Sequence, residues 1–153
     1  MNPASITRLD LVLATPEMFL LAATCVILLG DLFLRDRDRW ITFVLSLLTL
    51  AGVAWITAAT GFTERTVGWH GTYVADPLST LLKIVACGAV AVAFLYGHGY
   101  LQVRSILKGE YFVLGLLALL GIMVLISANS LVTLYLGVEL LALSLYALVA
   151  FNR

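Results

Sequence analysis

Five long runs of apolar residues make up most of this 153-residue chain, and short polar stretches separate them. A helix rises ~1.5 Å per residue, so roughly 17–25 residues can cross the hydrocarbon core of a bilayer. The runs are continuous, whereas the strands of a membrane barrel would alternate apolar and polar positions. We predict an all-α membrane protein, a polytopic bundle of five transmembrane helices at about residues 17–34, 41–60, 77–97, 111–128 and 131–150.

The polar connections carry further structural signals. Asp76-Pro77 predicts the start of the third helix, because aspartate is a favoured N-cap and proline suits the first helical position. Only residues 128–130 separate the fourth and fifth runs, so these two helices must be antiparallel neighbours. Trp69 and Tyr73 lie in the longest connection, where we expect them to be aromatic anchors at the membrane surface.

Basic residues are distributed unequally between the two sides of this bundle. Six of them lie in the connections 35–40 and 98–110 and at Arg153, whereas the opposite side has only Arg8 and Arg65. Cytoplasmic connections of membrane proteins are enriched in lysine and arginine. The pattern predicts an N-terminus outside and a C-terminus in the cytoplasm.

Composition excludes several classes of protein. With 62% hydrophobic and 12% charged residues, the chain is far from a soluble domain. Its net charge of zero gives no basic surface, so we expect no nucleic-acid partner. Cys25 and Cys87 each lie in an apolar run and resemble small core residues more than a disulfide or metal pair. We expect no cofactor or metal site in this chain and no removable signal peptide.

Glu139 is the only charged residue in the last apolar run and the strongest candidate for a functional site. On a helix it lies ~12 Å from one end of the run and ~16 Å from the other, and inserting a central acid costs roughly 2.5–3.5 kcal/mol. Tyr135 and Tyr146 share its stripe, whereas Gly137 and Ser144 form a small-residue stripe on the opposite side. The alternative role is a protonated glutamate, hydrogen-bonded to a tyrosine, that only assists packing.

Lys83 is the second candidate. It shares a helix face with Asp76 and Ser79, which makes it part of a polar stripe entering from the outer side. It lies only ~9 Å along the helix from Pro77, so its ammonium group can snorkel to the membrane surface. A role in a hydrated proton path is an equally good interpretation, and the sequence leaves both open.

Two further acidic residues have simpler interpretations. Asp31 lies near the inner end of the first run, where an ion pair with Arg35 one turn later would satisfy it. Glu110 opens the fourth run at the membrane surface. We interpret both as interfacial residues.

The motif around Glu139 resembles a known family. LVTLYLGVELLALSLYALVAFNR, preceded by GEYFVLGLLALLGIMVLISANS, is similar to the antiporter-like membrane subunits of respiratory complex I, whose pattern is a polar turn followed by L-G-x-E-L-x-x-x-x-L-Y. Pro16-Glu17, Gly30-Asp31-Leu32-Phe33 and Asp76-Pro77-Leu78-Ser79 make the subunit N branch, NADH-quinone oxidoreductase subunit N, the most similar. The resemblance runs over nearly the whole chain.

That resemblance implies a role. The family has about fourteen transmembrane helices in two inverted repeats, so we expect residues 1–153 to be one transmembrane domain in the N-terminal portion of a longer subunit, as a fragment or a split product. The family's fifth-helix glutamate pairs with a lysine on the seventh helix and takes part in proton translocation, a role that would fall to Glu139. The match assigns no role to any other residue of this chain.

The resemblance also implies partners and a location. The chain would lie in the bacterial inner (plasma) membrane beside other membrane subunits, and NADH, flavin, iron–sulfur clusters and quinone would be bound by partner subunits. It would contribute to proton translocation coupled to electron transfer from NADH to quinone. Two alternatives remain at this stage: a subunit of a multisubunit sodium/proton antiporter, which shares the glutamate pattern, and a non-catalytic structural membrane piece.

Overall fold

The computed structural model describes residues 10–33, 39–61, 64–103 and 109–150. Five long helices dominate it, which confirms the predicted all-α architecture. Their order and bounds are α2 (Thr15–Phe33), α3 (Arg39–Ala59), α4 (Pro77–Val103), α5 (Glu110–Ile126) and α6 (Leu131–Ala150). Among the helix bounds, the main difference from prediction is the end of α4, which continues to Val103 instead of ending near residue 97.

The helices have the length and composition of membrane spans. Among the described residues, four helices meet both requirements, and α5 is a shorter apolar helix of 17 residues. At ~1.5 Å per residue, 17 residues still extend for roughly 26 Å. The chain is a multi-pass membrane protein.

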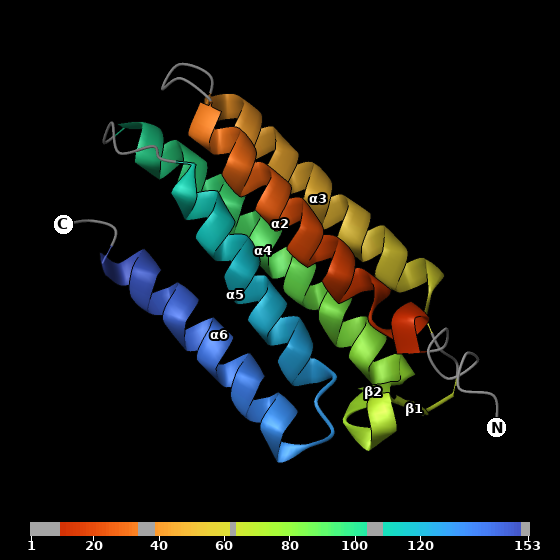
Figure 1. The fold of residues 1–153 in the computed structure, drawn as a ribbon. Coiled ribbons are helices and arrows are strands. Elements are labelled where there is room, and N and C mark those ends of the chain that lie inside the picture. The colour runs from red at the N-terminus through yellow and green to blue at the C-terminus, as the bar shows by residue number, and fades with distance from the viewer. Residues whose placement is uncertain (1–9, 34–38, 62–63, 104–108, 151–153) are drawn as a thin grey trace.

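Four of the helices form a closed ring, and the fifth lies outside it. α2 packs against α3, α3 against α4, α4 against α5, and α5 against α2, whereas α6 packs mainly against α5. Figure 1 shows α6 along the edge of the bundle, antiparallel to α5 as predicted. The helix ends that flank the three predicted cytoplasmic segments lie together, at the end of the bundle opposite the β-strands. Much of the surface of α6 is therefore not covered by the other described helices.

The core is centred on α5. Nine residues of α5 are buried, against two of α6. Phe112 is fully buried, and the rings of Phe94 and Phe43 lie 5.2 and 5.5 Å from its ring, centroid to centroid. Gly115 leaves room for the ring of Phe94, since a Cβ there would overlap it. This close packing makes α5 the central helix of the bundle.

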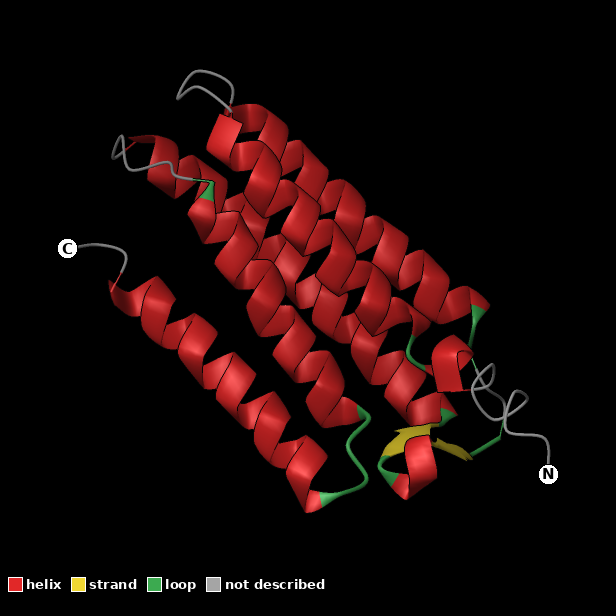
Figure 2. Cartoon of the chain, in the orientation of Figure 1, coloured by secondary structure: helices red, strands yellow, loops and turns green. Residues whose placement is uncertain are grey.

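A short β-hairpin was not predicted. β1 (Thr66–Gly68) pairs antiparallel with β2 (Tyr73–Ala75), and a 3₁₀ turn at Trp69–Gly71 joins them. Gly71 has a φ of 89°, which glycine adopts without the steric cost that a side chain brings. Figure 2 shows the two strands as the only sheet in the described chain, at one end of the helices.

The hairpin folds back onto the bundle. The Val74 N–H donates to the Ser127 carbonyl at 2.9 Å, and the Trp69 N–H donates to the Asp10 carboxylate at 2.8 Å. Trp69 is 45% exposed, but Tyr73 is only 8% exposed. The prediction that Tyr73 is a surface anchor is therefore wrong, because strand pairing turns its side chain toward the helices.

The predicted start of α4 is confirmed and has a capping motif. The Ser79 N–H donates to the Asp76 carboxylate at 2.6 Å, and the Ser79 hydroxyl oxygen accepts from the Asp76 N–H at 2.9 Å. We expect Asp76→Ala to destabilise the fold by ~1 kcal/mol, because an N–H in the first turn loses its acceptor. Asp76→Asn, which retains an acceptor, should lose less. Thermal unfolding followed by circular dichroism checks this, and equal losses in both variants would contradict the capping role.

Candidate functional site

Glu139 lies near the middle of α6, on the side that faces away from the ring of helices. Its side chain is partly buried, and Tyr135, one turn earlier on the same stripe, lies near it. Tyr135 and Tyr146, which share the stripe, are 60% and 70% exposed. Glu139 makes no ion pair with any residue that the structure describes. The carboxylate is thus accessible to a neighbour outside this part of the chain.

The opposite stripe of α6 holds the helix against α5. Gly137 and Ser144 are buried there, as their predicted role in close packing requires. A Cβ on Gly121 of α5 would lie 2.8 Å from the Leu141 nitrogen and 3.1 Å from the Gly137 carbonyl oxygen. The two backbones approach so closely that only glycine fits, and this contact orients the Glu139 stripe away from α5.

A second polar group lies inside the ring, at the hairpin end. Lys83 Nζ is 2.6 Å from Glu17 Oε1, and the two residues are 4% and 7% exposed. The Tyr73 hydroxyl accepts a hydrogen bond from Lys83 Nζ at 2.9 Å. Its own proton can be donated to Glu17 Oε1 at 2.8 Å or to the Leu13 carbonyl at 3.0 Å. We call Glu17, Tyr73 and Lys83 the buried cluster.

Three elements bring the buried cluster together. Glu17 is in the first turn of α2, Lys83 is in the second turn of α4, and Tyr73 opens β2. Burial raises the pKa of Tyr73 above its usual value of 10, and the nearby negative charge of Glu17 acts in the same direction. Tyr73 therefore keeps its proton over the physiological pH range and remains a hydrogen-bond donor.

The structure decides part of what the sequence left open about Lys83. Its ammonium group is buried in an ion pair, so snorkelling to the surface is wrong for this lysine. Glu17 and Tyr73 were missed as candidates, because their partners lie far away in the sequence. A glutamate on the buried face of an apolar helix was the available signal for Glu17. Lys83 and Glu139 are not brought together, since one lies between α2, α4 and β2 and the other on the outer side of α6.

The two remaining polar candidates, Asp31 and Glu110, lie near helix ends. Asp31 accepts a hydrogen bond from the Thr42 hydroxyl at 2.6 Å, but its predicted partner Arg35 lies outside the described residues. Glu110 is exposed in the first turn of α5, in agreement with an interfacial position.

The cysteines and possible metal ligands give no additional site. Cys87 is buried, but Cys25 is exposed, so the prediction that both are core residues is wrong for Cys25; both are free thiols. In the parts of the chain that the structure describes, no three His, Cys, Asp or Glu side chains come close enough together to hold a metal ion.

Comparison with known proteins identifies relatives of this chain. No protein-family model matches the chain. A protein of Nitrosomonas europaea is 49% identical over 144 residues, one of Alkalilimnicola ehrlichii 51% over 146, and one of Thioalkalivibrio sulfidiphilus 51% over 144. Each alignment covers 94% of this chain, and each relative is named "NADH-quinone oxidoreductase subunit N".

The extent of the match also matters. The chain spans about 30% of the length of these relatives. Their bacterial origin, together with the apolar helices, indicates a multi-pass protein of the bacterial inner membrane. The resemblance that the sequence motifs predicted is confirmed: over the stretch that they share, the chain is related to NADH-quinone oxidoreductase subunit N.

Proposed function

We propose that this chain is part of a membrane subunit of a proton-translocating NADH:quinone oxidoreductase, with Glu139 in the proton-translocation path. The shared name of the relatives supports the first part. One observation carries the second: a partly buried carboxylate lies near the middle of an apolar helix, on the face opposite the one that packs against α5. An ionisable group in such a position is costly and is by default a functional residue.

The surroundings of Glu139 suit a charge that responds to a neighbour. Tyr135 lies near the carboxylate on the same stripe, and the partly buried position limits the contact of the carboxylate with water. An ammonium group that approaches the free face would stabilise the ionised carboxylate, and its withdrawal would favour proton uptake. In this proposal NADH oxidation and quinone reduction take place in partner subunits, and Glu139 converts their signal into proton movement.

Glu139→Gln in the assembled complex tests the proposal. Glutamine has nearly the same shape but cannot take up the proton, so proton translocation and coupled quinone reduction should fall roughly tenfold or more. Both rates are measured in bacterial membranes, together with the amount of assembled complex. Glu110→Gln, the same change at an exposed site, is the matched control and should retain both rates.

Two results would contradict the role of Glu139. One is full proton translocation by an assembled Glu139→Gln complex. The other is wild-type activity in Glu139→Leu, which would show that the carboxylate serves at most packing, because an unneeded acid in a membrane helix is a cost.

A further inference from the structure

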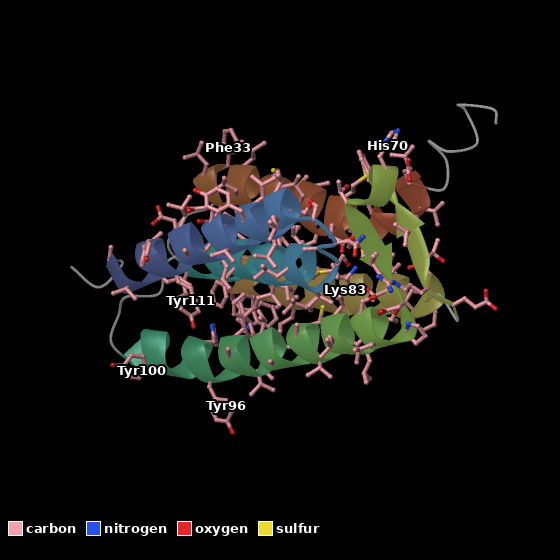
Figure 3. All side chains as sticks on the ribbon, turned by 90° about the horizontal axis from the view of Figure 1, so that it is seen from below. Phe33, His70, Lys83, Tyr96, Tyr100 and Tyr111 are labelled. Atoms are coloured by element: carbon pink, nitrogen blue, oxygen red, sulfur yellow. The ribbon has the colours of Figure 1, made fainter. Side chains whose placement is uncertain are left out.

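Burial of the two charged groups in the buried cluster has a large desolvation cost. Moving two charges out of water costs several kcal/mol per ion, and an apolar pair of similar size is often as stable as a buried ion pair or more so. Figure 3 shows Lys83 directed from α4 into the bundle, at the end where the hairpin lies. Protein stability alone therefore gives little reason for a buried ion pair at this position.

The cluster has unused hydrogen-bonding capacity. Glu17 Oε1 has two partners, but Glu17 Oε2 is buried without a hydrogen-bond partner among the described residues. A carboxylate is an acceptor through both of its oxygens. The Lys83 ammonium group has three N–H donors, of which Glu17 and Tyr73 engage two.

A polar crevice adjoins the cluster, and Lys83 lines both. The crevice has room for about one water molecule. Its hydroxyl groups come from α3, from the residue directly after α3 and from α4, and each donates its proton to a backbone carbonyl three or four residues earlier in the chain. The hydroxyl oxygens of the three threonines therefore remain available as acceptors, whereas that of Ser79 already accepts from the Asp76 N–H. The residues that carry these hydroxyl groups are Thr57, Thr60, Ser79 and Thr80.

We propose that Glu17, Tyr73 and Lys83 form a second proton-binding site, which exchanges protons with water through this crevice at the hairpin end of the bundle. A proton moves from Lys83 Nζ to Glu17, so that one N–H bond breaks and one O–H bond forms. The neutral amine then takes a proton from a hydronium ion that reaches the crevice, so that one O–H bond breaks, one N–H bond forms and a neutral water molecule is left. The cluster has gained one proton and one positive charge, and no electron has moved.

Among the residues that the structure describes, few other ionisable groups lie close to this site. α2 contributes Glu17, β2 contributes Tyr73, and α4 contributes Lys83, with Cys87 one turn further along. The end of α3 and the residue after it face the crevice with uncharged threonines, Thr57 and Thr60. The exchangeable proton therefore belongs to the Glu17–Lys83 pair.

The substitution Lys83→Arg distinguishes between a proton-binding site and a purely structural ion pair. Arginine keeps the positive charge and can pair with Glu17, but its guanidinium does not release a proton. A purely structural pair would tolerate the change. We expect the assembled complex to show at least twofold fewer protons translocated per electron, and to lose the infrared carboxyl signal that appears when the purified wild-type complex is acidified. Glu64→Gln, an exposed carboxylate near the hairpin, should leave both readouts unchanged.

A second variant covers the case in which arginine does not fit. Glu17→Gln/Lys83→Met removes both charges, so no unpaired ion stays buried and the complex should still assemble. The same losses of proton translocation and infrared signal are expected. Wild-type values for both readouts in either assembled variant would overturn the proposal. Failure of both variants to assemble would also overturn it, because the pair would then be a structural requirement.

The inference rests on the proposed function only for the translocation readout. If protons do not pass through this subunit, Glu139→Gln and the cluster variants would all leave the protons per electron unchanged, yet the infrared signal would still identify Glu17 as a group that protonates. If only the cluster variants keep wild-type readouts, this inference fails and the role of Glu139 stands.

Discussion

Replacing Lys83 with methionine is expected to destabilise the bundle by about 3–5 kcal/mol, the largest effect of any single substitution considered for this protein. Methionine fills a similar volume, but it leaves the Glu17 carboxylate buried, with the Tyr73 hydroxyl as its remaining partner. An unpaired buried charge costs much more than the pair contributes. Thermal unfolding of the purified protein in detergent measures the loss.

The matched control removes both charges. Glu17→Met/Lys83→Met should be close to the wild type in stability and clearly more stable than Lys83→Met alone, because no buried ion is left without its partner. Adding Glu17→Met separately completes a double-mutant cycle, which isolates the energy of the pair. Equal destabilisation by the single lysine variant and the double variant would show that lost packing, and not the unpaired charge, is responsible.

Gly121→Ala is expected to destabilise the protein by about 1–3 kcal/mol through overpacking between α5 and α6. The added Cβ would lie 2.8 Å from the Leu141 nitrogen, and this atom belongs to the backbone of α6 and can move only with the helix. Thermal unfolding gives the stability. The orientation of Glu139 depends on the same contact, so proton translocation in the assembled complex should fall with it.

Gly88→Ala is the matched control for this prediction. A Cβ at Gly88 of α4 would meet no atom within 4 Å, so the change should be neutral or stabilise by up to ~1 kcal/mol through helix propensity. If both alanine variants unfold alike, the close approach of α5 and α6 is not important for stability.

Local patterns in the sequence determined most of the helical architecture. Each apolar run is long enough to cross the membrane, so the number of runs set the number of helices. Within lipid, the backbone N–H and C=O groups of such a run can form hydrogen bonds only inside a helix. Asp76-Pro77 determined the start of α4 through hydrogen bonds within a single turn. The two opposite stripes of α6 followed from the helical period, which is why the close packing at Gly137 and Ser144 could be predicted.

Contacts between distant segments were decided only by the tertiary structure. Glu17 and Tyr73 are 56 positions apart, and no periodicity relates a residue on α2 to one on a strand beyond α3. The hairpin that buries Tyr73 depends on the bundle against which it packs, since three residues per strand have little stability alone. The position of α6 outside the ring likewise depends on which helix faces meet α5. Amino-acid pattern thus specified the helices and their faces, whereas packing in three dimensions specified which charges meet.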